Sequence, residues 1–379
     1  MAEPLRKAAL TKLSVAGQRG GAAGGGATLV GGASTSSSTS SSGSSVGCPW
    51  LCVLTGASRG FGAAFAELLS AEILGPGSLL LLSARSLEPL RLLAHRLLAQ
   101  RHGGPPQEPG GQGCVGGEPR EERGPQEEKG SLLVSCPGGC LRLLCVAADL
   151  EGPEGLQALE AALRTQEPGR YRRLLVLNNA GSLGDVSRRV RDVTTAEWAP
   201  LCRHLQLNVA APLLLAAFAL RWFQGLEEAE GTGGDEGPSG RVAMVINVSS
   251  LCAITPYPSW APYCSSRAAR DMLHVVVATE EPHVRVLNYA PGPMDTDMQA
   301  EACVQTGDAG LRGRLEKSRA AGTLVDPRDS ARALLRLLRA DSFRSGAHVD
   351  YYDVPGPRRE GDGAETARRG REGGTPQGQ

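Results

Sequence analysis

Short runs of consecutive apolar residues alternate with longer segments of helical periodicity from about residue 50 onward. The apolar runs are uninterrupted, which is typical of strands in a parallel sheet that helices cover on both faces. They predict strands at residues 51–54, 79–83, 141–147, 174–177, 242–248, 284–288 and 347–351. Helices are predicted at 61–74, 87–101, 156–164, 198–223, 263–281 and 330–339. The pattern indicates an α/β fold of Rossmann type, a single doubly wound parallel sheet of about seven strands with helices on both faces.

Composition restricts the folded part of the 379 residues. Residues 1–47 are rich in Gly and Ser, and residues 354–379 in Gly, Pro and charge. Such segments bury too little apolar surface to offset the entropy lost on ordering. We therefore predict a disordered extension at 1–47, one domain at 48–353 and a disordered tail at 354–379. Within the domain, we predict a disordered insertion at 103–139 and a surface loop at 225–240.

Charge and hydropathy exclude several classes of partner. The 40 basic and 40 acidic residues balance, whereas a nucleic-acid binder usually carries a basic excess. No apolar run approaches the roughly 20 residues that a membrane-spanning helix needs. The ten cysteines include no Cys-x-x-Cys pair, so we expect free thiols in a cytosolic protein and no metal site. We therefore expect a small-molecule ligand and neither a nucleic acid nor a membrane as partner.

A glycine-rich turn joins the first predicted strand to the first predicted helix. Glycines at this junction allow a tight turn and let the backbone approach a pyrophosphate, whose charge the helix N-terminus stabilises. The plainer interpretation is an ordinary turn, because the chain contains 50 glycines. The preceding apolar strand favours the dinucleotide interpretation. The predicted cofactor contacts in this turn are Gly56, Ser58, Arg59, Gly60, Phe61 and Gly62.

The ends of the next strands indicate which dinucleotide is bound. The second strand ends in Ser83-Ala84-Arg85 and lacks the acid that holds the ribose 2′-OH of NAD. Arg59 and Arg85 suit a 2′-phosphate, although both could also be solvated surface residues, so NADPH is favoured over NADH. Asp149 and Leu150 follow the third strand and could contact the adenine, while a helix N-cap is an equally good interpretation of the acid. After the fourth strand, small residues permit close approach to a flat ligand, at Asn179, Ala180 and Gly181.

The candidate reacting centre lies further along the chain. Ser250 ends the fifth strand and Tyr263 begins a helix, so both are expected at the carboxyl edge of the sheet, where ligands bind. A phenol can protonate a carbonyl oxygen, and a serine hydroxyl can hydrogen-bond the same atom. Arg267 lies four residues after Tyr263 on the same helix face, where its charge favours the ionised phenol.

This order of motifs resembles the short-chain dehydrogenase/reductase family. Strings at 54–62 and 178–187 carry the general resemblance, and strings at 284–299 and 345–353 are similar to those of family members that reduce pterins. The resemblance implies a homodimeric, cytosolic, NADPH-dependent enzyme. Its substrates would be the side-chain carbonyls of pterins such as 6-pyruvoyl-tetrahydropterin, and its end product tetrahydrobiopterin.

The resemblance also assigns roles to residues. Ser250 and Tyr263 fall on the catalytic Ser and Tyr of the family, and Asn208 falls on the helix Asn that supports a proton-relay water. Asp350 falls on the acid that anchors the pterin, whose guanidine-like edge can donate two hydrogen bonds to a carboxylate. Further substrate contacts would be Leu251, Tyr257, Trp260 and Gly292, with ordinary packing as the competing interpretation of the two aromatic residues. The segment expected over the nicotinamide comprises Met294, Asp295, Thr296, Asp297, Met298 and Gln299.

One residue departs from the family. Arg267 stands where the family has a Lys that bonds the nicotinamide ribose, favours the ionised Tyr and joins a proton relay. Arg keeps the charge, but its fork is larger and does not release a proton. We expect retained cofactor binding and reduced turnover. The alternatives are a carbonyl reductase of broader specificity and a non-catalytic NADPH-binding protein.

Overall fold

The computed structural model describes residues 48–102, 120–122, 130–136, 140–229 and 241–356. The predicted extension at 1–47 lies outside the described residues, as do most of the predicted insertion, loop and tail.

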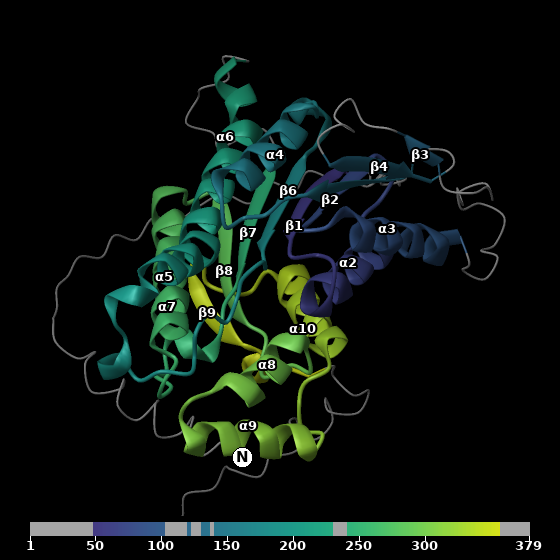
Figure 1. Cartoon of the computed structure of the whole chain (residues 1–379). Coiled ribbons are helices and arrows are strands. Elements are labelled where there is room, and N and C mark those ends of the chain that lie inside the picture. Colours follow the sequence, from purple (N-terminus) through teal and green to yellow (C-terminus); the bar gives the residue numbers. More distant parts are fainter. Residues whose placement is uncertain (1–47, 103–119, 123–129, 137–139, 230–240, 357–379) are drawn as a thin grey trace, which may run out of the picture. The chain divides into compact units, whose positions relative to one another are not determined.

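One twisted sheet forms the centre of the described domain (Figure 1). The seven predicted strands are confirmed as β1 Trp50–Thr55, β2 Ser78–Ala84, β5 Leu141–Ala147, β6 Arg173–Asn178, β7 Val242–Val248, β8 Val284–Ala290 and β9 Ala347–Asp350. All seven are parallel and lie in the order β5-β2-β1-β6-β7-β8-β9. The chain winds in one direction from β1 to β2 and later in the other direction from β1 to β6. That switch leaves a crevice at the carboxyl ends of the strands.

The prediction of about seven strands in a purely parallel sheet is wrong in one respect. The described chain has nine strands, because β3 Arg120–Glu122 and β4 Ser131–Ser135 add an antiparallel pair beside β5 and make the sheet mixed. Both come from 103–139, which we predicted to be disordered throughout. Leu132 and Val134 alternate with half-buried neighbours on β4, so one face of this short strand packs into the core. A strand of five residues gives only a short apolar pattern within a long polar insertion, so the sequence did not predict β4.

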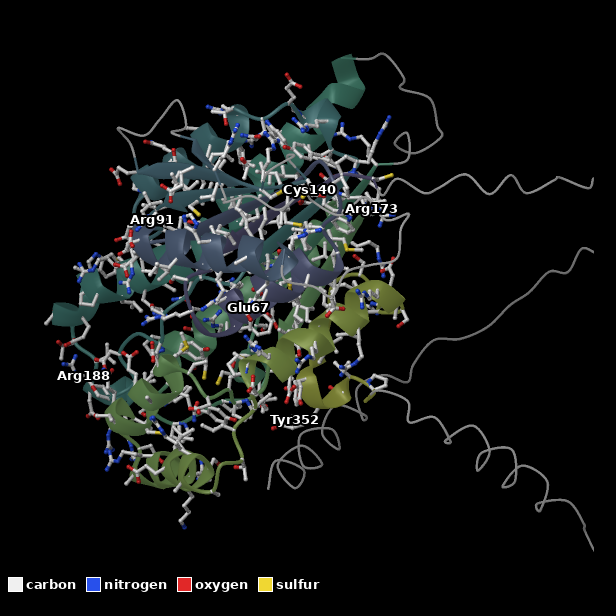
Figure 2. All side chains as sticks on the ribbon, turned by 90° about the vertical axis from the view of Figure 1, so that its right-hand side faces the viewer. Glu67, Arg91, Cys140, Arg173, Arg188 and Tyr352 are labelled. Atoms are coloured by element: carbon white, nitrogen blue, oxygen red, sulfur yellow. The ribbon has the colours of Figure 1, made fainter. Side chains whose placement is uncertain are left out.

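Helices cover both faces of the sheet, as predicted (Figure 1). Apolar residues of α2 Gly60–Glu72, α3 Leu87–His102 and α10 Pro327–Ala340 share one core cluster with alternate strand residues. The opposite cluster contains residues of α4 Pro153–Arg164 and α6 Ala211–Ala229, and Val277 and Ala278 of α7 Ala261–Glu280 pack against it. Glu67 on α2, labelled in Figure 2, contacts Arg96 of α3 at 3.1 Å and Arg328 of α10 at 2.7 Å. These two ion pairs join the three helices of the first layer.

Other helix predictions need correction. The helix expected at 198–223 is three segments: α5 Trp198–Leu205, a π-helical turn Gln206–Ala210, and α6. The π turn admits one extra residue per turn, a feature that often occurs at functional sites. The helix α6 continues to Ala229, so the first five residues of the loop expected at 225–240 are helical, and the rest lie outside the described residues. We did not predict α8 Asp297–Gln305 and α9 Ala309–Ala320, whose weak apolar patterns are compensated by side-chain N-caps at Thr296 and Asp308.

The stretch Thr195–Gln224 is long and apolar enough to cross a membrane by length and composition alone. In this fold, 44% of its most apolar window is buried against the rest of the domain. A core helix passes the same test, so the stretch is weak evidence for a membrane span.

Candidate active site

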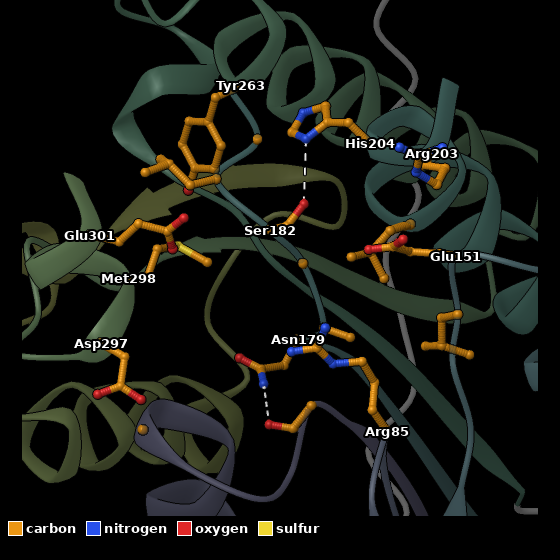
Figure 3. A pocket seen from close by; sticks show the side chains of 18 of the residues that line it. Arg85, Glu151, Asn179, Ser182, Arg203, His204, Tyr263, Asp297, Met298 and Glu301 are labelled. Carbon is orange, nitrogen blue, oxygen red and sulfur yellow. Dashed lines mark hydrogen bonds between the residues drawn. The ribbon is translucent and has the colours of Figure 1, made fainter. Parts of the chain in front are cut away.

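A cavity of about 1300 Å³ opens at the carboxyl ends of the parallel strands. Its lining brings together side chains from the glycine turn, the ends of β2, β5, β6 and β7, the helices α5 and α7, and the segment before α8 (Figure 3). Of the predicted cofactor contacts, those that line it are Gly56, Ser58, Arg59, Gly60, Phe61, Arg85, Asp149, Leu150, Asn179, Ala180, Gly181, Arg267, Met294, Asp295, Thr296, Asp297 and Met298. Gly62 and Gln299 do not line the cavity.

The glycine turn has the backbone geometry that a bound pyrophosphate requires. Gly56 and Gly60 have φ angles of 64° and 55°, in the left-handed region that favours glycine. A side chain on Gly62 would collide with the Gly56 carbonyl, so close packing of α2 against the turn requires glycine there. Arg59 caps α2 without a side-chain hydrogen bond to the first turn, and the helix N-terminus lies at the cavity. This donor-rich end suits a phosphate group.

Residues after β6 hold the adjacent wall of the cavity. The Asn179 amide donates to the carbonyls of Thr55 and Gly56, each at 3.0 Å. The Thr55 hydroxyl accepts from the backbone N–H groups of Asn179 and Ala180, each at 3.1 Å. These four bonds fix the loop after β6 against the loop after β1. The small residues in this loop therefore serve packing between two loops as well as an open ligand wall.

Tyr263 and Arg267 lie together in the cavity wall. Both are buried, and the Arg267 guanidinium carbon lies 4.9 Å from the centre of the Tyr263 ring. Its Nη1 donates to the Val248 carbonyl at 3.1 Å, while its Nε has no hydrogen-bond partner among the described residues. A Cβ atom on Gly181 would lie 2.6 Å from Nη2. The guanidinium therefore occupies space that is free because Gly181 has no side chain, and its charge lies over the face of the Tyr263 ring.

A second arginine lies one helical turn further on and does not line the main cavity. The Arg270 guanidinium is fully buried and donates to the Asn178 carbonyl, to the Ala180 carbonyl at 2.9 Å and to the Asn247 side chain. Burial lowers the pKa of Arg270, and the charge of Arg267 lowers it further, while the carboxylate of Asp271 opposes both. One buried cation thus ties α7 to the ends of β6 and β7.

The remaining predicted catalytic residues lie beside the cavity lining. Ser250 caps the 3-10 turn Leu251–Ala253, and its hydroxyl accepts the N–H of Cys252 at 3.2 Å. Asn208 is fully buried in the π turn, where its Oδ1 accepts the N–H of Ser182 at 3.3 Å. Neither residue lines the cavity, although Ser249 and Ser182 beside them do.

The predicted substrate contacts also lie outside the lining, except Tyr263. Trp260 packs edge-on against both Tyr257 and Tyr263, at ring-centre distances of 5.7 and 5.6 Å, so the three rings form a row. Burial raises the pKa of Tyr257 to about 12, and the negative charges of neighbouring groups, Asp350 among them, add to the increase. Asp350 ends β9, and its carboxylate accepts the N–H of Tyr352 at 3.0 Å. Leu251 is exposed on its 3-10 turn, and Gly292 packs against Val325 and Tyr351.

The cavity has lining residues that sequence reasoning did not identify. Ser182 and His204 face one another across it, and the charged side chains of Glu151, Asp185, Arg188, Glu197 and Arg203 also line it. The side chains of α5 carry no motif, and only the three-dimensional contact of α5 with α7 brings them to the site. No cluster of three His, Cys, Asp or Glu side chains that could hold a metal is found in the described part of the chain.

The comparisons with known proteins agree with this geometry. The family profile described as short chain dehydrogenase matches residues 135–306. The crystal structure of L-sorbose reductase from Gluconobacter frateurii, solved with NADPH and L-sorbose, has a TM-score of 0.54 and 21% identity. The alignment covers 80% of this chain and 95% of that one, and it shows the fold. Fold and site together define a short-chain dehydrogenase/reductase.

Sequence matches over a larger part of the chain identify the family within this class. A sepiapterin reductase from Rattus norvegicus is 41% identical over 313 residues, which cover 82% of this chain and 99% of that protein. The sepiapterin reductase of Meriones unguiculatus is 42% identical over 309 residues, or 81% and 98% of the two chains. The benzil reductase of Bacillus subtilis, which forms (S)-benzoin, is 32% identical over 190 residues, or 49% and 71%. The chain belongs to the sepiapterin reductase family.

The Arg270 network predicts a large stability effect. Replacing Arg270 with Met leaves three buried acceptors without their donor, so we expect a loss of about 3 kcal/mol in the free energy of unfolding. Urea unfolding measures this loss. The control Arg332→Met, at an exposed position on α10, should change stability by at most about 0.5 kcal/mol. Equal effects of the two substitutions would contradict the assigned role of Arg270.

Proposed function

We propose that this protein catalyses the NADPH-dependent reduction of pterin side-chain carbonyls. The substrates would be sepiapterin and 6-pyruvoyl-tetrahydropterin, and the pathway product tetrahydrobiopterin. The observation that carries the proposal is the placement of Tyr263 and the buried cation Arg267 in the same cavity as the glycine turn. Membership of the sepiapterin reductase family supports the choice of substrate.

The residues along the cavity fit NADPH. The glycine turn and the first turn of α2 would hold the pyrophosphate, and Arg59 and Arg85 would hold the 2′-phosphate. Arg59 forms an ion pair with Asp297 at 2.7 Å, but both side chains are largely exposed. Such a pair contributes little and gives way readily to a phosphate. The buried Ser83 hydroxyl, which lines the cavity and has no partner among the described residues, is a further donor on this wall.

The chemistry follows from the residues around Tyr263. NADPH, when bound, supplies the hydride for the substrate carbonyl carbon. Tyr263 protonates the carbonyl oxygen, and Ser250 donates a hydrogen bond that fixes the same oxygen. Arg267 holds its positive charge against the face of the Tyr263 ring, 4.9 Å from the ring centre. We assign the nicotinamide side of the cavity to residues 294–298, and the support of a proton-relay water to Asn208.

The aromatic row supports a flat heterocyclic substrate. Trp260 packs between the rings of Tyr257 and Tyr263, and the Asp350 carboxylate is close enough to raise the pKa of Tyr257. A pterin laid along this row would present its guanidine-like edge to Asp350 and its side chain to Tyr263. We assign Leu251 and Gly292 to the rim of this subsite.

Reduction of simple diketones is a second candidate function. It is favoured by the similarity to a benzil reductase over about half of the chain. A cavity that recognises only the carbonyl would need Tyr263 and Ser250 but not Asp350. The two functions therefore differ in their dependence on one carboxylate.

Arg267 is the first position to test. We expect the purified chain to oxidise NADPH in the presence of sepiapterin, and Arg267→Lys to raise kcat by about tenfold or more, because Lys restores a group that releases protons. NADPH affinity should change little, since both residues keep the charge. Arg285→Lys, at a residue paired with Asp341 away from the cavity, is the matched control.

Two results would count against this assignment of Arg267. Equal kcat values for the natural chain and Arg267→Lys would show that the guanidinium does not limit turnover. NADPH binding without turnover in the natural chain, with activity only in Arg267→Lys, would favour a non-catalytic NADPH-binding protein.

Asp350 distinguishes pterin reduction from general carbonyl reduction. Asp350→Asn keeps the size of the side chain and removes its charge, so kcat/KM for sepiapterin should fall by roughly 10- to 100-fold. Reduction of benzil by the same variant should be unaffected, which makes the diketone an internal control. A parallel loss with both substrates would point to a structural role for Asp350, and no loss with either would remove it from the site.

Exposed apolar side chains support a homodimer. Leu213 and Leu214 on α6 and Met272 and Val276 on α7 are exposed, and these helices cover the same face of the sheet. A second copy of the same two helices would bury all four in a self-complementary interface. Leu214→Glu should therefore convert a dimer to a monomer in light-scattering measurements. Leu92→Glu, at an exposed residue of α3 on the other face, should leave the dimer intact. A monomeric natural chain would refute the proposal.

A further inference from the structure

The arginine at position 267 leaves one step of the proposed reaction without a proton source. Each turnover consumes the proton of the Tyr263 phenol, and a second proton must reach that oxygen before the next turnover. Arg267 is fixed by its bond to the Val248 carbonyl, and a guanidinium does not give up its proton. Another group that lines the cavity must therefore return the proton. This inference rests on the proposed function.

His204 is the histidine that lines the cavity, so it is the candidate for this proton transfer. Its side chain extends from α5 into the cavity wall, opposite Ser182 and near Tyr263 (Figure 3). Its Nδ1 lies 3.4 Å from the Ser182 hydroxyl and 3.2 Å from the Asn208 amide nitrogen. Its Nε2 lies 3.2 Å from the Pro262 carbonyl and 3.0 Å from the Ser266 hydroxyl. The imidazole thus joins the loop after β6 and the π turn to the start of α7.

The partners of the ring determine which nitrogen is free to take up a proton. The Pro262 carbonyl only accepts, and the Ser266 hydroxyl donates to the Tyr263 carbonyl at 2.9 Å. The hydrogen of the neutral imidazole is therefore assigned to Nε2. Nδ1 is left as an acceptor, with the Asn208 amide N–H on one side and the Ser182 hydroxyl, which itself lines the cavity, on the other.

The protein is closely fitted around this ring. Only 6% of His204 is exposed, and a Cβ atom on Gly184 would lie 2.5 Å from its Nδ1. Arg267 on α7 is the charged group that acts on His204, and Arg203, Asp185, Arg188 and Glu197 also line the same cavity. Burial lowers the pKa of His204, the Pro262 carbonyl raises it, and the charge of Arg267 lowers it. The net direction is below the ordinary value of 6.5.

We propose that His204 is the proton-relay residue of this active site, and that it acts through Ser182 in place of the family Lys. The imidazole takes up a proton at Nδ1 from solvent in the cavity. After Tyr263 has protonated the substrate, Nδ1–H passes its proton to the Ser182 oxygen, and the proton of that hydroxyl moves through cavity water to the phenolate. One proton is transferred, the imidazole returns to its neutral form, and no bond between heavy atoms changes.

The test compares His204→Gln in two backgrounds, the natural chain and Arg267→Lys, with sepiapterin and NADPH. In the natural background we expect kcat to fall on the order of 100-fold, the usual size of a lost proton-transfer group. In the Lys background the loss should be less than about threefold, because Lys restores the family relay and the two substitutions are coupled. Ser182→Ala should reproduce this dependence on background while disturbing fewer contacts.

His274→Gln is the matched control. His274 is also a buried histidine, bonded to Asn178 and to the Arg270 carbonyl, but it does not line the main cavity. Its substitution should lower Tm and change kcat by the same factor in both backgrounds. NADPH affinity and Tm, measured for every variant, separate a folding defect from a relay defect.

The pH profile provides an independent readout. Proton donation by His204 is complete below its pKa and is lost as pH rises through it. In the natural chain kcat should therefore decline with rising pH, with a midpoint below 6.5, and this decline should be absent from His204→Gln. A purely structural role for His204 would leave the profile unchanged in shape.

The outcomes separate the two proposals. Absence of sepiapterin turnover in both natural and Arg267→Lys chains would overturn the proposed function and this inference with it. Turnover that His204→Gln reduces equally in both backgrounds, or does not reduce at all, would overturn the relay and leave the proposed function standing. If His204→Gln does not fold, the same comparison with Ser182→Ala decides the matter.

Discussion

The buried guanidinium of Arg270 is the contact on which the arrangement of the site depends. It satisfies the carbonyls of Asn178 and Ala180 and the side chain of Asn247, where two parallel strands end and their loops diverge. Removing a guanidinium from water is costly, so the charge is tolerated only because all three of its nitrogens are bonded. The same contact fixes the register of α7 against the sheet. Tyr263 and Arg267 lie on the preceding turns of α7, so the contacts of Arg270 also fix their positions.

Chemistry and packing impose different demands on position 267. Packing accepts a guanidinium, because Gly181 leaves room for Nη2 and Tyr263 offers a ring face to the charge. The reaction demands a group that both carries charge and exchanges protons, and arginine meets only the first demand. The neighbouring imidazole of His204 meets the second. Two residues on different helices can thus divide a task that one lysine performs elsewhere in the family.

Much of the fold follows from local patterns, because uninterrupted apolar runs and glycine turns act over a few residues. Seven strands could be predicted in this way, as could the cavity lining at Gly56 and at Asn179 to Gly181. His204 was not, because its partners Ser182, Asn208 and Ser266 come together only through tertiary packing. The π turn around Asn208 could not be predicted from the sequence either, since a single widened turn leaves the helical periodicity almost unchanged. The polar helix α9 depends on its Asp308 cap rather than on an apolar stripe.

The antiparallel strands beside β5 have a consequence for the behaviour of the protein at high concentration. An open edge of a sheet invites a strand from another molecule, which is a common route to aggregation. Here the outermost strand, β3, is three residues long and consists of Arg120, Glu121 and Glu122. Glu121 is further held by Arg91 and His95 of α3. A short, charged strand that is held by side-chain contacts is a poor template for the addition of another strand. Among the described residues, β3 therefore protects this edge of the sheet from self-association.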